Sequence, residues 1–184
     1  ARDMADTGDW ITPRVNGLLR FDKPPLVYWL MGAFYALPFQ LNFDPLGTWA
    51  ARLPSALASL VMMLALGDTV MSFPQKGDTH PRYTALAVSF AFGLSPLVIL
   101  CSRAAVSDAL LCSTLGLSLL SHWRRYASPS ANPWYLGWIL LGLAVLTKGP
   151  VALVLTTLVL GLFAFLRSDC LKLLQCLHPL PGLF

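Results

Sequence analysis

Charged residues are scarce in this sequence. Only 12% of its 184 residues are Asp, Glu, Lys or Arg, about half the share usual in soluble domains, whereas 56% are hydrophobic and the mean hydropathy is +0.63. This composition excludes an ordinary soluble domain and indicates a membrane protein. The formal net charge of +4 is not gathered into a basic run, so it does not favour nucleic acid as a partner.

Several sequence signatures are also missing. Glycine-rich nucleotide-binding motifs and internal repeats are absent, and the cysteines form no CxxC pair. The four cysteines lie in or beside apolar runs, as small apolar residues in helices typically do. They are Cys101, Cys112, Cys170 and Cys176. The N-terminus lacks the charged segment and apolar core of a signal peptide. Because an initiator Met is also lacking, we interpret the chain as a fragment of a longer protein or as a truncated reading frame.

Long apolar runs between charged residues occupy most of the chain. A helix needs about 20 such residues to cross a bilayer. The sequence predicts five transmembrane helices within residues 53–167, at about 53–73, 83–101, 105–121, 134–147 and 151–166. The fourth is short and requires a tilt or a thin bilayer. The predicted fold class is therefore all-α, a polytopic membrane helix bundle with a cytoplasmic or interfacial tail at 168–184.

A shorter apolar run lies near the N-terminus. It covers residues 25–37, which is too few to cross a bilayer. Pro24 and Pro25 suit the start of a helix, and aromatic residues such as Tyr28 and Trp29 suit the membrane interface. We expect a helix that lies along the membrane surface, and a short first span is the alternative.

The charged connections orient the predicted spans. Three alternate connections carry the cations Lys76 and Arg82, Arg124 and Arg125, and Arg167 and Lys172. The positive-inside rule places these connections in the cytoplasm. Residues 1–52 then form a loop with interfacial helices on the opposite, outer face, together with the remaining turns. The charged residues of that face, here called the outer-face set, are Asp9, Asp22, Lys23, Arg52, Arg103, Asp108 and Lys148.

Ionisable residues beside apolar segments are functional candidates, because charge is costly to place in a bilayer. Cations at the level of the lipid headgroups suit an anionic ligand, such as a lipid phosphate. A carboxylate there is suited to hold a metal ion or to act as a general base. Structural roles stay open for the same residues. In these alternatives Lys148 complements the dipole of its helix, Asp108 is part of a helix cap, and Asp22 forms a local ion pair with Lys23.

Four motifs occur in a characteristic order: "GDW", "KPPL", "RLPSAL" and "LTKGPV". With the stretch "SRAAVSDALL" between the last two, the order and spacing over residues 1–167 resemble the N-terminal half of a membrane-enzyme superfamily. This is the superfamily of bacterial aminoarabinose transferases and protein O-mannosyltransferases, which are GT-C glycosyltransferases. The resemblance implies helices lying along the periplasmic face, one of them beginning at "KPPLVYWL".

The resemblance implies an activity as well as a fold. It implies that a sugar passes, with inversion, from a polyprenyl-phosphate donor to a hydroxyl or lipid acceptor. The reaction would take place on the periplasmic face of the inner membrane, and membrane lipids would surround the enzyme. The sugar and the acceptor, lipid A or protein hydroxyls among others, stay open.

The resemblance also assigns roles to residues. Lys23 matches the lysine that contacts the donor phosphate, and Arg52, Arg103 and Lys148 match motif positions expected to help bind it. Asp108 matches an acidic residue at the start of the span after a short turn. It is the catalytic candidate within this chain.

The sequence departs from the family at two points. Asp22 stands where many relatives have a glutamate, which is one methylene longer and is assigned as a metal ligand in some of them. A divalent metal ion is thus the candidate cofactor. The family's catalytic base belongs to an acidic motif, commonly Asp-Glu, that precedes the position of Ala1, so we expect this chain alone to be inactive.

Two other classes of function stay open. One is a structural membrane subunit or a non-catalytic remnant of a transferase gene. The other is a transporter component, which would place charges in mid-span or break its helices in paired halves. The predicted spans carry their charges at their ends, and this favours the enzyme.

Overall fold

The structure is a computed structural model that describes residues 1–15, 18–19, 23–37, 46–105 and 107–177. Almost all of its regular structure is helical, so the prediction of an all-α fold is confirmed. The helices are α1 (Arg2–Thr7), α2 (Leu26–Tyr35), α4 (Thr48–Ser72), α5 (Pro81–Gly93), α6 (Pro96–Arg103), α7 (Ser107–Ala127), α8 (Trp134–Lys148), α9 (Val151–Arg167) and α10 (Cys170–Leu177). Two short antiparallel strands, β1 (Arg14–Val15) and β2 (Leu18–Leu19), pair with each other.

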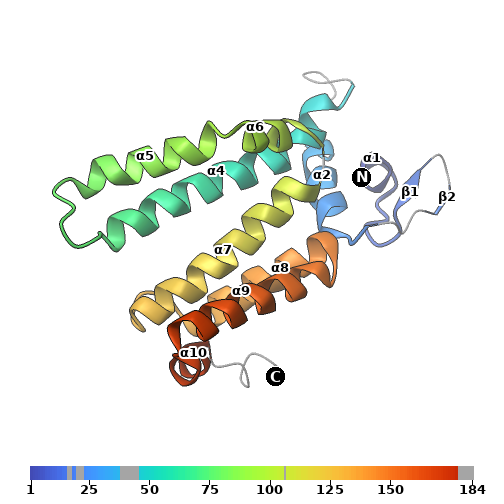
Figure 1. Ribbon diagram of the computed structural model, residues 1–184. Helices are drawn as coiled ribbons and strands as arrows, with labels where there is room; N and C mark the ends of the chain where they lie inside the picture. The colour runs from blue at the N-terminus through green and yellow to red at the C-terminus, as the bar shows by residue number, and fades with distance from the viewer. Residues whose placement is uncertain (16–17, 20–22, 38–45, 106, 178–184) are drawn as a thin grey trace.

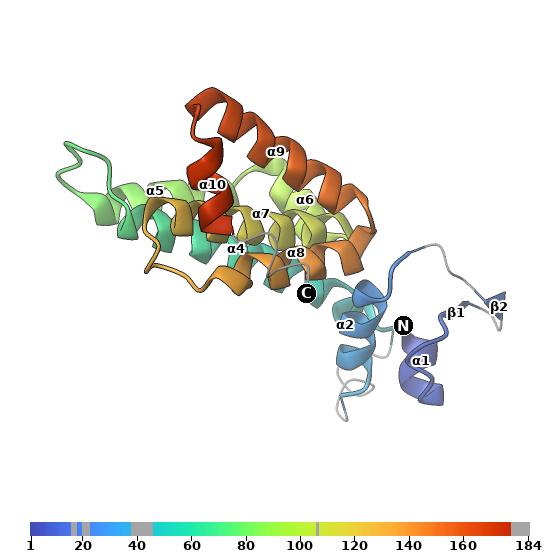
Figure 2. The same cartoon turned by 90° about the horizontal axis from the view of Figure 1, so that it is seen from below.

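The long helices form two groups (Figure 1). Helices α4 and α5 run side by side, and α7, α8 and α9 lie next to them, with α7 in contact with α4. The N-terminal elements α1, β1, β2 and α2 stand at one end of this bundle (Figure 2). There α2 packs against α4 and α8. The KPPL segment, which begins with Lys23 and leads into α2, therefore meets the ends of these two long helices.

The interior of the bundle is built from small and hydroxyl-bearing side chains. Ser118 and Thr147 are fully buried, and Ser118 Oγ donates to the carbonyl of Gly137 on the neighbouring helix at 2.8 Å. Thr147 Oγ1 donates to the carbonyl of Leu143 one turn earlier, at 2.9 Å. Large apolar side chains such as Leu158 and Phe165 face outward instead. This distribution is typical of helices that pack together in lipid, where small residues let backbones approach closely.

One helix among the described residues is long and apolar enough to cross a membrane, Thr48–Ser72, and a second candidate is the bent pair α5 and α6. Helices α8 and α9 are shorter apolar helices. A helix rises about 1.5 Å per residue, so the 15 residues of α8 reach only part of the way across a hydrocarbon core of about 30 Å. The five crossings, and the surface position of α2, stay predictions.

The second predicted span is not one continuous helix. We expected a single run over residues 83–101, but α5 ends at Gly93 and α6 begins at Pro96, with an angle of 59° between them. Pro96 has no backbone N–H and disfavours the helical conformation of the residue before it, and Ser95 has an extended ψ of 127°. Proline therefore places the break, and α6 turns aside toward the start of α4.

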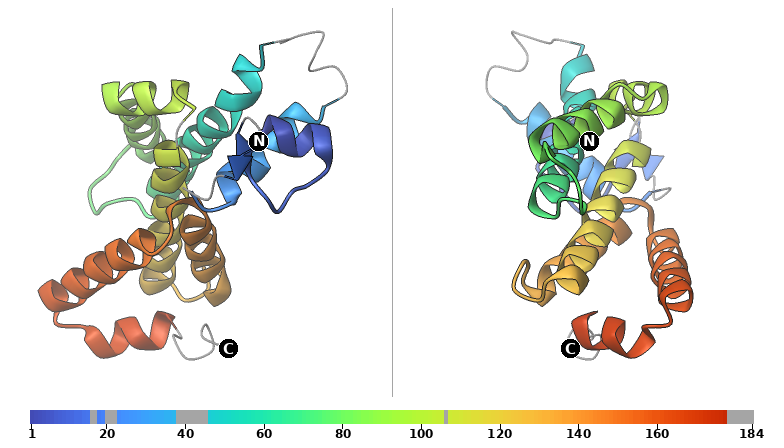
Figure 3. Two further views of the ribbon diagram at one scale, coloured as in Figure 1. Left: turned by 90° about the vertical axis from the view of Figure 1, so that its right-hand side faces the viewer. Right: turned by 60° about the vertical axis from the view of Figure 1, so that its left-hand side comes forward.

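The tail after the last predicted span folds back on the bundle. Helix α10 runs beneath the ends of α7 and α9 (Figure 3), and Leu173 and Leu177 are buried against Ala164. Nε of Arg125 donates to the carbonyl of Cys176 at 2.7 Å. Trp138 Nε1 donates to the carbonyl of Leu177 at 2.8 Å. These donors satisfy carbonyl groups at the end of α10 that have no partner within the helix.

Candidate active site

Two charged residues of the outer-face set form an ion pair. Nζ of Lys148, in the last turn of α8, donates to Oδ1 of Asp108, in the first turn of α7. The carboxylate lies at the positive end of one helix and the ammonium at the negative end of the other, so both helix dipoles favour the pair. Both side chains are about half exposed, 54% for Asp108 and 47% for Lys148. The pair is therefore accessible to a ligand.

The local sequence around Lys148 brings it to this position. Gly149 has a positive φ of 76°, which suits glycine, and its N–H donates to the carbonyl of Val145 at 2.7 Å. Pro150 then caps α9, which begins at Val151, so only two residues separate α8 from α9. The turn is so short that Lys148 stays at the edge of the bundle, facing the start of α7.

The KPPL segment lies beside this turn. Cγ of Pro24 is 4.0 Å from the position that a Cβ atom on Gly149 would occupy. Pro25 is the cap of α2, and the N–H of Trp29 donates to its carbonyl at 2.9 Å. Lys23 is exposed and immediately precedes these prolines. Segments 125 residues apart in sequence, around Lys23 and Lys148, therefore meet at one end of the bundle.

Arg52 and Arg103 lie at the same end of the bundle as Lys148, but they line a separate hollow. Arg52 is in the second turn of α4 and Arg103 is the last residue of α6. Both line a hollow of about 300 Å³, together with Trp49 and Ser102. In the described part of the chain, neither guanidinium forms an ion pair with a carboxylate. Two cations that share one hollow suit a phosphate or carboxylate ligand.

Asp9, the acidic residue of the GDW motif, does not join the ion pair between Lys148 and Asp108. The N–H groups of Thr12 and Ile11 donate to Oδ1 of Asp9 at 3.1 and 3.2 Å, and these hydrogen bonds lower the pKa of Asp9 from its ordinary value. Arg14 Nη2 lies 3.8 Å from the other carboxylate oxygen. Asp9 therefore organises a turn, which is a structural role for the acid of the GDW motif.

The tryptophan of the GDW motif has a structural role as well. Trp29 Nε1 on α2 donates to the carbonyl of Trp10 at 2.7 Å. The Trp10 ring lies against Gly32, where Cζ3 would be only 2.7 Å from an added Cβ atom. No sequence pattern predicted this contact, although a glycine within an aromatic-rich helix marks a position of close approach.

The predicted metal ligand, Asp22, lies outside the described residues. Within the described ranges, no three His, Cys, Asp or Glu side chains are grouped so that they could hold a metal ion. Asp108 faces an ammonium group rather than a second carboxylate. The described residues therefore do not assemble a metal-binding donor set, and the divalent ion stays a prediction.

Comparison with known proteins assigns the family. A family model described as dolichyl-phosphate-mannose-protein mannosyltransferase matches residues 22–179. The chain belongs to this family. It is thus a member of the superfamily of GT-C membrane glycosyltransferases that the motif order predicted, and that prediction is confirmed.

Individual relatives agree with the family assignment. An uncharacterized protein of Aquifex aeolicus is 36% identical over 90% of this chain and 35% of its own length. An undecaprenyl phosphate-alpha-4-amino-4-deoxy-L-arabinose arabinosyl transferase of Pseudomonas aeruginosa is 31% identical over 83% of this chain and 26% of its own. The chain therefore spans about a third or less of the length of these relatives.

Solved structures show the same fold. The apo structure of ArnT from Cupriavidus metallidurans superimposes with a TM-score of 0.83, at 27% identity, over 99% of this chain and 32% of that one. ArnT bound to undecaprenyl phosphate superimposes with a TM-score of 0.69 at 24% identity, over 97% of this chain. The helix arrangement is therefore that of ArnT, and the described members of the outer-face set lie at one end of it.

Proposed function

We propose that this chain forms the donor-phosphate side of a membrane glycosyltransferase. The enzyme transfers a sugar, with inversion, from a polyprenyl-phosphate donor to a hydroxyl or lipid acceptor at the periplasmic face of the inner membrane. The observation that carries the proposal is the meeting of the KPPL segment with the Lys148–Gly149–Pro150 turn at one end of the bundle. The named substrate of the Pseudomonas relative and the lipid bound to ArnT are both undecaprenyl phosphates, and this supports the donor class.

In this proposal Lys23 binds the donor phosphate. It is exposed, and in the part of the chain that the structure describes it has no carboxylate partner. As the bond to the sugar breaks, negative charge grows on the leaving phosphate. A cation held at that oxygen stabilises the transition state more than the ground state and lowers the barrier.

Lys148 and Asp108 have a second role in this proposal. Because Asp108 holds the ammonium of Lys148 from the side of α7, the cation is positioned before the donor arrives. Arg52 and Arg103 add positive charge at the same end, where they attract anionic lipid headgroups. The general base that deprotonates the acceptor is expected in the motif that precedes the position of Ala1.

Substitution of Lys23 tests the proposal. In membranes that contain the full-length protein, we expect Lys23→Ala to reduce the transfer of labelled sugar from a polyprenyl-phosphate donor at least about tenfold. Lys172→Ala is the matched control, because Lys172 lies over the Tyr126 ring at the other end of the bundle. Turnover of Lys23→Ala at the wild-type rate would refute the role of Lys23.

A second assay separates the enzyme from the structural alternative. Deletion of the full-length gene should make lipid-linked sugars accumulate, which thin-layer analysis would detect. An unchanged lipid-linked sugar pool would favour a non-catalytic subunit. We further expect purified residues 1–184 to show no transfer, and measurable transfer by them would contradict the assignment of the base to a preceding segment.

A further inference from the structure

A second hollow lies at the end of the long helices opposite Arg52, Asp108 and Lys148. Arg52 and Phe73 are near the two ends of α4, about 30 Å apart at the rise of a helix. The hollow has a volume of about 600 Å³ and lies between the end of α4, the connection to α5, the start of α5 and α7. This volume is within the range of sites that bind small molecules.

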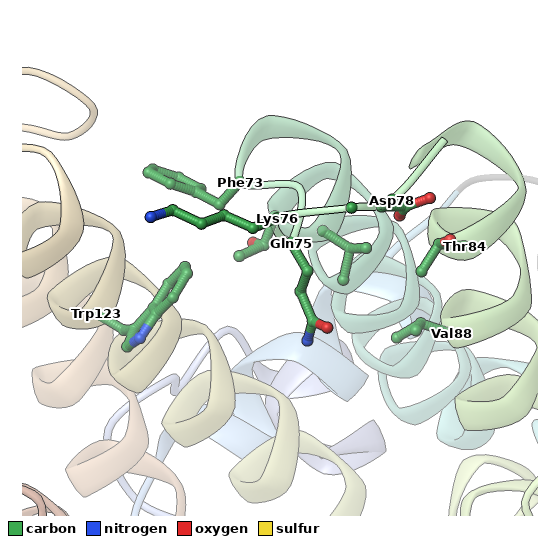
Figure 4. A pocket seen from close by; sticks show the side chains of 10 residues that line it. Phe73, Gln75, Lys76, Asp78, Thr84, Val88 and Trp123 are labelled. Atoms are coloured by element: carbon green, nitrogen blue, oxygen red, sulfur yellow. The ribbon is translucent and has the colours of Figure 1, made fainter. Parts of the chain in front are cut away.

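The hollow carries one charge of each sign. Lys76 extends toward Phe73 and Trp123, whereas the carboxylate of Asp78 lies on the other side, near Thr84 (Figure 4). Neither charged group forms an ion pair with a described residue. Oδ1 of Asp78 accepts a hydrogen bond from the N–H of His80 at 2.9 Å, and this fixes the carboxylate beside the start of α5.

The neighbouring acid is already neutralised. Asp68 precedes Thr69, which lines the hollow, and its Oδ2 lies 2.7 Å from Nη1 of Arg124. Nη2 of the same guanidinium lies 3.4 Å from Oγ of Ser72. Because the Asp68 carboxylate is already paired with Arg124, it does not compete with a ligand for the ammonium group of Lys76.

Aromatic rings form the wall beside the cation. The rings of Phe73 and Trp123 meet edge to face, with centroids 5.2 Å apart, and the Arg124 guanidinium lies 6.0 Å from the Phe73 centroid. Aromatic residues at the ends of transmembrane helices are typical of the headgroup level. This wall suits the glycerol and upper acyl region of a lipid, while the charged groups face its head.

The pair of opposite charges selects the class of ligand. A purely anionic ligand would be repelled by Asp78, and a cation would be repelled by Lys76. A phosphate ester that also carries an ammonium group satisfies both, and basic pockets between membrane helices commonly bind lipid headgroups. We propose that this hollow binds the headgroup of a zwitterionic, amine-bearing phospholipid, with the phosphate at Lys76 and the ammonium at Asp78. The proposal does not depend on sugar transfer.

Lipid retention by the purified protein tests the proposal. The protein, in detergent, would be loaded with equal amounts of phosphatidylethanolamine and phosphatidylglycerol, and bound lipid would be counted by native mass spectrometry. We expect at least about fivefold preference for phosphatidylethanolamine, and Lys76→Gln should weaken its retention about tenfold. Asp78→Asn should remove the preference, because only the ammonium group distinguishes the two lipids at that carboxylate.

The controls separate this site from general surface charge. Arg82→Gln makes the same change of charge nearby, in the first turn of α5, but Arg82 does not line the hollow, so retention should stay within about twofold of wild type. Water-soluble phosphoethanolamine tests whether the acyl chains contribute. Retention that excess phosphoethanolamine does not displace supports a lipid ligand. Displacement by an equimolar amount, equal retention of the two lipids, or equal losses in Lys76→Gln and Arg82→Gln would overturn the proposal.

Discussion

The ammonium of Lys148 is hydrogen-bonded to the carboxylate of Asp108, and the two residues are 40 positions apart in the chain. The pair joins the end of α8 to the start of α7 at the end of the bundle where the KPPL segment also lies. Each residue alone fits a local role, as a partner for a helix dipole or as part of a cap. Together they form a positioned and accessible charge pair, which a local role does not require.

Neutralising Asp108 should separate catalysis from stability. The pair is about half exposed, so we expect Asp108→Asn to change the free energy of unfolding by less than about 1 kcal/mol. Transfer by the full-length protein should nevertheless fall at least about tenfold, because Lys148 loses the group that positions it. Thermal unfolding and initial transfer rates would be measured on the same preparation. A large loss of stability with unchanged turnover would show that the pair is structural.

Gly137 should tolerate no side chain. A Cβ atom there would lie 2.4 Å from Cε1 of His122, whose ring is buried and packs edge to face on Trp138 at 5.4 Å. Gly137→Ala should destabilise the protein by about 1 to 3 kcal/mol through overpacking.

Gly142 provides the matched control for that substitution, because it is in the same helix and its Cβ position is free of contacts within 4 Å. Gly142→Ala should be neutral or stabilising by up to about 1 kcal/mol, as alanine favours the helix. Denaturation in detergent would measure both variants. Equal stability of the two would contradict the packing of α7 against α8 at His122.

Arg125 should hold α10 in place. Its guanidinium donates to the carbonyls of Cys176, Pro129 and Asn132, at 2.7, 3.2 and 3.0 Å. Arg125→Ala removes all of these hydrogen bonds, each worth about 1.5 to 3 kcal/mol because the donor is charged. Lysine should rescue only in part, since its single ammonium lacks the planar arrangement of donors.

Limited proteolysis would report the release of α10. We expect cleavage within residues 168–177 to accelerate in Arg125→Ala and, to a smaller degree, in Arg125→Lys. Arg167→Ala, at the end of α9, is the control and should leave the rate near that of wild type. Cleavage that is equally fast in wild type and in Arg125→Ala would show that α10 does not depend on this arginine.

The sequence predicted the helical fold and the positions of the helices better than their continuity. Apolar runs between charged residues indicated α4, α7, α8 and α9, because in a bilayer every backbone group must be paired within its own helix. The apolar run did not indicate the break at Pro96, since hydropathy averages over a run and does not register one missing N–H. The docking of α10 was also not predicted, because it depends on donors from Arg125 and Trp138 elsewhere in the chain.

The sequence by itself determined which residues carry charge in an apolar chain, and the order of its motifs determined the family. Tertiary structure alone decided which of these charges meet. Lys148 pairs with Asp108, Arg52 shares a hollow with Arg103, and Arg124 pairs with Asp68. The physical reason is that Coulomb interactions and hydrogen bonds depend on distances in space, and residues far apart in sequence come within reach only when the helices pack.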